Sequence, residues 1–78
     1  MEQKIKQDNK IQLGRNIRRL RLEKGFKQTE MVALLQMENI SMTREALVKI
    51  ERGVQHVTVT QLRGIRNVLD TTYEELLK

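Results

Sequence analysis

The segment Thr43 to Gly53, TREALVKIERG, constrains the fold more than any other part of this chain. It predicts a short amphipathic helix with a signal at each end. The Thr43 hydroxyl can accept a hydrogen bond from an unpaired backbone N–H at the start. Gly53 can take the left-handed conformation that often ends a helix. The apolar residues at helical spacing, which we expect to face inward, are Ala46, Leu47 and Ile50.

The opposite face of this predicted helix is polar and carries Arg44, Glu45, Val48 and Lys49. A bundle of helices does not need so many hydrogen-bonding groups on one outward face. Arginine and lysine at the exposed N-terminal end of such a helix suit guanine edges and phosphates. DNA reading is therefore the leading hypothesis for this segment.

Helical spacing also dominates the chain before this segment. A first helix is predicted from Asn9, which can form a capping pair with Gln12, to Gly25. Its inward residues are Leu13, Ile17 and Leu20. A second helix is predicted from Gln28 to Glu38, ended by Asn39, which tolerates the left-handed conformation. Its inward residues are Met31, Leu34 and Leu35.

Two more helices follow. Thr58 with Gln61, and Thr72 with Glu75, both have the spacing of a capping box. The first pair opens a helix whose inward residues are Leu62, Ile65 and Leu69, and a turn at Asp70 and Thr71 follows it. The second pair opens a short last helix that carries Tyr73, Leu76 and Leu77. The stretch VQHVTVTQ alternates like a strand, but a helix start explains it better.

The prediction is thus an all-α fold of five short helices. With 78 residues and no proline, low-complexity tract or repeat, the chain is expected to form one domain over residues 11–78. Residues 1–10 are polar and are expected to form an arm. No cysteine is present, which excludes disulfides and zinc-thiolate sites. The chain lacks an apolar run of about 20 residues and a secretory signal, so a cytoplasmic protein is expected.

The net charge of +5 is unevenly distributed. Residues 1–27 hold nine lysines and arginines against three acids, whereas residues 28–78 hold six against seven. Such a one-ended positive field favours a polyanion as partner, and nucleic acid before membrane, because no aromatic-rich amphipathic face is available for lipid. Charge alone is weak support, since basic solvated faces are common. Arg15, Arg18 and Arg19 are thus expected on the solvated face of the first helix, with a phosphate role for one or two of them as the alternative.

The sequence offers few residues that could catalyse a reaction or bind a metal. His56 is the sole histidine, so it has no partner for metal binding or for catalysis. No nucleophile–base pair and no glycine-rich phosphate loop is present, so neither an enzyme, a cofactor nor a small-molecule site is expected. Met31, Met37, Met42 and Leu35 are expected to be core or packing residues and not part of a cofactor site.

Three stretches together have a familiar pattern: LGRNIRRLRLEKGFKQTEMVALL, ISMTREALVKIERG and VTVTQLRGIRNVLDTTYEELL. Over residues 13–77 the chain resembles the phage-repressor type of helix-turn-helix domain, the Cro and xenobiotic-response-element family. The resemblance implies five helices, of which the second and third form the DNA-binding motif. It also implies operator binding as a homodimer, mostly in repression.

The resemblance also assigns roles to particular residues. The base-contacting positions are Arg44, Glu45 and Lys49. Gln28 matches the glutamine with which the family holds a phosphate at the start of the second helix. By their position, further phosphate contacts are expected from Thr43 and from three residues after the third helix, Arg52, Gln55 and His56. Arg21 and Glu51 match an internal ion pair of the family and are expected to be structural.

The chain departs from the family pattern in two places. The second and third helices are usually joined by three or four residues. This chain has about five more residues between Met31 and Ile50 than the pattern has, in the segment QMENISM. We expect them to lengthen the second helix by a turn and to widen the connection. Lys27 stands where the family often has a serine or threonine cap.

Two alternatives remain open from the sequence. The domain could be a protein-interaction module or an antitoxin-like adaptor whose main partner is another protein. The apolar residues near the C-terminus could form a dimer interface or could instead close the domain's own core. These residues are Val68, Tyr73, Leu76 and Leu77.

Overall fold

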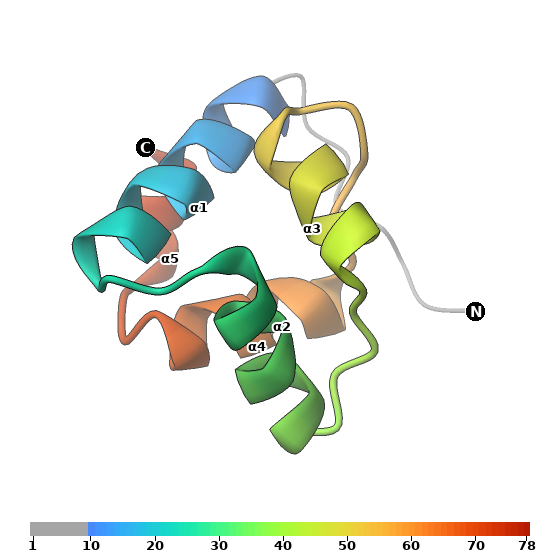
Figure 1. Cartoon of the computed structure of the whole chain (residues 1–78). Helices are drawn as coiled ribbons and strands as arrows, with labels where there is room; N and C mark the ends of the chain where they lie inside the picture. Colours follow the sequence, from blue (N-terminus) through green and yellow to red (C-terminus); the bar gives the residue numbers. More distant parts are fainter. Residues whose placement is uncertain (1–9) are drawn as a thin grey trace.

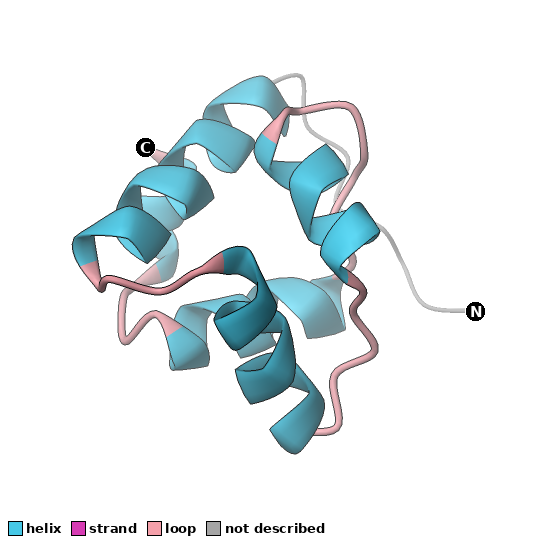
Figure 2. Cartoon of the chain, in the orientation of Figure 1, coloured by secondary structure: helices cyan, strands magenta, loops and turns pink. Residues whose placement is uncertain are grey.

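A computed structural model describes residues 10–78, and in this range the chain forms five helices (Figures 1 and 2). They are α1 (Lys10–Glu23), α2 (Gln28–Met37), α3 (Arg44–Glu51), α4 (Val59–Val68) and α5 (Tyr73–Leu77). The all-α fold and the order of the five predicted helices are confirmed. Helix α1 packs against α3 and α5, and α2 packs against α3 and α4.

The helix starts depend on threonine caps, as predicted. The Thr43, Thr58 and Thr72 hydroxyls each accept a hydrogen bond from the backbone N–H three residues later, at 3.0, 3.1 and 3.1 Å. The Gln61 amide oxygen in turn accepts a hydrogen bond from the Thr58 N–H at 3.1 Å, which completes the capping box of α4. Each cap satisfies a backbone donor that the helix itself leaves unpaired.

Helix α2 begins differently, because Lys27 makes no side-chain cap. Its backbone N–H instead donates to the Glu30 carboxylate at 2.9 Å. At the other end, Asn39 adopts the left-handed conformation with φ of 62° that the sequence predicted for it. The helix stops at Met37, one residue earlier than predicted.

The core is apolar and contains residues from every helix, including Leu13, Ile17, Met31, Leu35, Leu47, Ile50, Ile65, Leu69 and Leu76. Two predictions about α2 are wrong in detail. Val32 is buried whereas Leu34 is only half-buried, so the inward face is rotated toward Val32. Met37 was expected to be a core or packing residue, but it is 79% exposed as the last residue of α2.

One polar side chain in the core ties the C-terminus to α1. Asn16 is 4% exposed, and its amide nitrogen donates to the carbonyl oxygens of Leu76 at 2.9 Å and Lys78 at 3.1 Å. These bonds satisfy carbonyls that a short final helix leaves unpaired. The predicted Asn9–Gln12 capping pair lies outside the described residues, and Lys10, assigned to the arm, is the first residue of α1.

Candidate nucleic-acid interface

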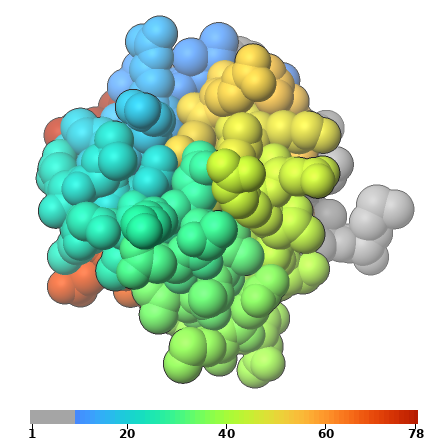
Figure 3. Space-filling view, viewed as in Figure 1, coloured from blue at the N-terminus to red at the C-terminus, as the bar shows by residue number. Residues whose placement is uncertain are grey.

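Helix α3 presents one face to the core and the other to solvent. Leu47 and Ile50 are 0% and 1% exposed, while Arg44, Glu45 and Lys49 are all exposed. Residues of α2 and α3 lie side by side on one face of the molecule (Figure 3). The three side chains predicted to contact bases are therefore accessible on the side of α3 that faces away from the core.

The C-terminal end of α3 is anchored by a buried ion pair. The Arg21 Nε and Nη2 atoms donate to the two carboxylate oxygens of Glu51 at 2.7 and 3.0 Å. The Arg21 Nη1 atom donates to the carbonyl oxygen of Phe26 at 2.8 Å. Arg21 and Glu51 are each 6% exposed, so the pair lies in the interior, as its expected structural role requires. A bidentate pair of this kind fixes orientation as well as distance.

A close approach of two backbones accompanies this ion pair. A Cβ atom at Gly14 of α1 would overlap the carbonyl oxygen of Ile50 and would lie 2.7 Å from that of Glu51. Any side chain at position 14 would therefore push α1 and α3 apart. Gly53, which follows the helix with φ of +78°, ends α3 as predicted.

The N-terminal end of α3 follows a long connection. Six residues, 38–43, separate α2 from α3, compared with the three or four of a tight turn. The predicted widening of the connection is thus present. Ile40 and Met42 of this connection are buried at 8% and 3% exposure, so it packs against the body of the domain.

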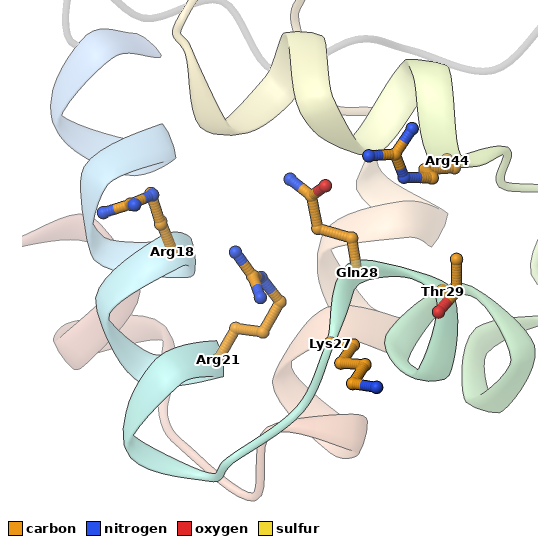
Figure 4. A pocket seen from close by; sticks show the side chains of 6 residues that line it. All are labelled: Arg18, Arg21, Lys27, Gln28, Thr29 and Arg44. Atoms are coloured by element: carbon orange, nitrogen blue, oxygen red, sulfur yellow. The ribbon is translucent and has the colours of Figure 1, made fainter.

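A cleft of about 480 Å³ opens between α1, the start of α2 and the start of α3 (Figure 4). It is lined by Arg18, Arg21, Lys27, Gln28, Thr29 and Arg44. Four of these six residues are cationic and none is acidic. Within residues 10–78, Arg21 alone among the four has an acidic partner, so three positive charges remain uncompensated in the cleft. Such a cleft is suited to a phosphate group.

Gln28 stands between this cleft and the buried ion pair. Its amide nitrogen donates to the Glu51 carboxylate at 3.2 Å. An amide nitrogen carries two hydrogens, so a second donor remains for a ligand in the cleft. Gln28 therefore connects the cleft to Glu51, the residue that anchors α3.

The other residues predicted to contact phosphate lie around the ends of α3. Thr43 is exposed, and its hydroxyl can still donate although it accepts the cap bond. Arg52 is exposed just after α3, and Gln55 and His56 are half-buried in the loop that follows. The His56 Nδ1 atom is buried without a hydrogen-bond partner in the described part of the chain. When the imidazole carries its proton on Nε2, that nitrogen is the donor, and Nδ1 is an acceptor.

Sequence reasoning did not include Lys27 and Thr29 among the site residues and treated Arg18 mainly as a solvated side chain. A signal for them was present. Lys27 and Thr29 flank Gln28, and Arg18 precedes Arg21 by three residues and so shares its side of α1. By contrast, Arg19 forms ion pairs with two acidic residues, Glu23 at 3.0 Å and Glu75 at 3.6 Å.

The residues offered as dimer contacts separate into two groups. Leu76 is 0% exposed and belongs to the domain's own core, so of the two alternatives left open from the sequence the second holds for it. Val68 is half-buried against the core. Tyr73 and Leu77 are 39% and 48% exposed and remain accessible on α5.

Residues 10–78 contain no group of three or more His, Cys, Asp or Glu side chains arranged to hold a metal ion. Within the same range, none of the helices combines the length and hydrophobicity of a membrane span.

An exposed polar helix held by its inner face, next to cations that lack an acidic partner within residues 10–78, is the arrangement expected of a helix-turn-helix domain. The family model described as helix-turn-helix matches residues 17–76, and the chain belongs to this family. No relative among curated proteins matches the chain.

Solved structures with the same fold include two proteins of restriction-modification systems and one gene regulator. The controller protein C.AhdI from Aeromonas hydrophila has a TM-score of 0.77 at 24% identity, with 90% of this chain and 98% of that chain covered. The clp gene regulator ClgR from C. glutamicum has a TM-score of 0.72 at 23% identity over 87% and 82%. The controller protein C.Esp1396I, solved as a tetramer on its 35 base-pair operator, has a TM-score of 0.71 at 22% identity over 94% and 100%.

Proposed function

We propose that this protein is a sequence-specific DNA-binding transcription regulator that acts as a homodimer on an inverted-repeat operator, mainly as a repressor. The observation that carries the proposal is the exposed polar face of α3, with Arg44 at its N-terminal end and at the rim of the cation-lined cleft. A helix of this kind fits the major groove, where its first residues meet base edges.

In this proposal three side chains of α3 read bases. Arg44 donates in bidentate fashion to O6 and N7 of a guanine. Glu45 accepts from a cytosine amino group or orients Arg44. Lys49, one turn later, takes a guanine or a phosphate. All three are exposed and can reach a duplex without any rearrangement of the core.

The phosphate contacts position the duplex without reading its sequence. We assign one backbone phosphate to the cleft, held by Gln28 together with Arg18 and Lys27, which line the same space. Further phosphates are assigned to Thr43 and to the residues after α3, which are Arg52, Gln55 and His56. If Z phosphates are neutralised, log affinity falls with log salt at a slope of about −0.9Z.

Dimer formation is proposed through the exposed residues Tyr73 and Leu77 of α5. Two copies would place their α3 helices in successive major grooves, about 34 Å apart. The operator complex named for C.Esp1396I, a tetramer on 35 base pairs, supports a multimeric assembly on DNA. The proposal also includes the cytoplasm as the location, a polar arm before Lys10, residues 10–78 as the DNA-binding domain, and a regulator in place of an enzyme.

Selection of bound sequences from random DNA at a stated salt concentration tests the proposal. Enrichment of an inverted repeat, bound in a salt-dependent manner, supports both the function and the dimer. No enrichment, together with tight binding to a protein partner, would establish the interaction-module alternative. The matched control is Arg63→Ala, because Arg63 is exposed on α4 and is absent from the proposed interface.

A further inference from the structure

The connection between α2 and α3 is held by a contact with α4. Ile40 of the connection lies directly over Gly64, near the middle of α4. A Cβ atom at Gly64 would lie 2.7 Å from the Cγ1 atom of Ile40 and 3.1 Å from the Cδ2 atom of Leu35. The Cγ1 atom can move only by rotation about the Cα–Cβ bond of Ile40, which is stiff in a β-branched side chain, or together with the backbone of the connection. The absence of a side chain at position 64 therefore sets how closely the connection approaches α4.

Glycine at this position disfavours the helix that contains it. Glycine in a helix interior is about 1 kcal/mol less favourable than alanine, and Gly64 lies within the ten residues of α4. The close approach of Ile40 gives this glycine a structural role that helix propensity alone does not explain.

Two glutamine side chains secure the same connection by hydrogen bonds. The Gln36 amide nitrogen donates to the Met42 carbonyl oxygen at 3.0 Å, and the Gln61 amide nitrogen donates to the Ser41 carbonyl oxygen at 3.3 Å. The Gln61 amide oxygen meanwhile accepts from the Thr58 N–H at 3.1 Å. Gln61 thus caps α4 with one end of its amide and holds the connection with the other.

We propose that Gly64 and Gln61 of α4 are positioning residues for DNA reading: through Ile40 and Ser41 they set the direction in which the N-terminal end of α3 points. This inference depends on the proposed function. The C-terminal end of α3 is fixed independently at Gly14 and by the Arg21–Glu51 pair. With one end of the helix fixed, the connection determines where Arg44, two residues after Met42, lies.

The two kinds of DNA contact differ in their tolerance to such a displacement. Hydrogen bonds to base edges need donor–acceptor distances within a few tenths of an ångström. Phosphate contacts by long cationic side chains are largely electrostatic and tolerate small shifts. A displaced α3 would therefore lose specific binding and keep non-specific binding.

The test measures the affinity of Gly64→Ala for the selected operator and for scrambled DNA of equal length at one salt concentration. We expect the affinity for the operator to fall about tenfold, the size of one lost base-pair contact, while non-specific affinity stays within about twofold. Equal losses on both DNAs, or no loss on either, would overturn the inference.

A second variant keeps the inference testable if Gly64→Ala fails to fold. Gln61→Glu retains an oxygen acceptor for the Thr58 N–H but removes the donor to Ser41. We expect circular dichroism to show an intact fold and the ratio of operator to scrambled affinity to fall. Using the ratio cancels the added negative charge, which weakens both affinities alike. An unchanged ratio contradicts the inference, whereas failure of the wild-type protein to select any operator contradicts the proposed function instead.

Discussion

The two ends of α3 are held by different chemistry. At its C-terminal end, the buried Arg21–Glu51 pair and the backbone contact at Gly14 anchor the helix to α1. At its N-terminal end, the apolar side chains of Ile40 and Met42 anchor the connection that leads into it. A charged pair fixes orientation through hydrogen-bond geometry, whereas an apolar contact fixes distance through packing. Together they hold a helix whose outer face is free to meet DNA.

The difference also concerns what each anchor can tolerate. Removing one partner of a buried ion pair leaves an uncompensated charge in the interior. Adding a methyl group beside an apolar side chain forces off-rotamer side chains and a small shift of the backbone of the connection. Substitutions at the charged end of α3 should therefore lower the stability of the fold, and substitutions at the apolar end should change the orientation of α3.

The largest expected effect is that of Arg21→Ala. Within residues 10–78, Glu51 would remain buried with only the Gln28 amide as a side-chain partner, and the loss of stability should be about 3–5 kcal/mol. Thermal or urea unfolding measures it, and operator binding should fall with the folded fraction. Arg63→Ala, which changes an exposed arginine of α4, serves as the control. Stability equal to that of the control would mean that the pair does not anchor α3.

Gly14→Ala and Gly64→Ala form a matched pair that compares the two ends directly. At Gly14 the added methyl group meets backbone carbonyl oxygens, and at Gly64 it meets mainly side-chain atoms. We expect Gly14→Ala to cost about 1–3 kcal/mol or more in the free energy of unfolding and Gly64→Ala to cost less. Urea unfolding of both variants measures the difference. The comparison between the two ends fails if the order is reversed.

Replacing the unpaired cations of the cleft should change binding rather than stability. Arg18→Ala and Lys27→Ala should each weaken binding to all DNA sequences about equally and lower the salt slope by about 1. Affinities over a series of salt concentrations measure this slope. Arg19→Ala is the matched control, because Arg19 faces Glu23 and Glu75 rather than the cleft. A cleft that holds no phosphate would leave the slope unchanged in both variants.

The smallest expected effect concerns an exposed ion pair far from α3. The hydrogen bond and charge of Lys78, with a smaller contribution from Arg19, lower the pKa of Glu75 below its ordinary value of 4.5. A lowered pKa stabilises the fold above the ordinary value, and this contribution is lost as the pH falls through the folded pKa. Glu75→Gln should therefore be slightly less stable than wild type at pH 7, and the difference should vanish in acid. Thermal unfolding at both pH values measures it, and a difference that grows in acid would contradict the assignment.

Features that depend on neighbouring residues along the chain were predictable from the sequence. Thr43, Thr58 and Thr72 cap their helices as expected, because a cap involves a side chain and a backbone N–H only three residues away. The exposed face of α3 followed from helical spacing. The Arg21–Glu51 pair came from the family resemblance, since thirty residues separate its members.

Contacts between distant segments were not predictable in this way. The burial of Leu76 and the exposure of Leu77 are decided by how α5 packs on α1. The contact of Ile40 with Gly64 depends on the path of a connection that departs from the family pattern. The bonds from Asn16 to the last carbonyls need the whole fold to form first.

The most direct test of the account is repetition of the random-DNA selection with Arg44→Ala beside wild type at the same salt concentration. We predict that wild type enriches an inverted repeat and that the variant enriches the same repeat with one symmetry-related pair of positions relaxed. Its affinity for the wild-type operator should be lower by about 1–3 kcal/mol. An unchanged selected sequence with uniformly weaker binding would make Arg44 a phosphate contact, and α3 would then not read bases through its N-terminal end.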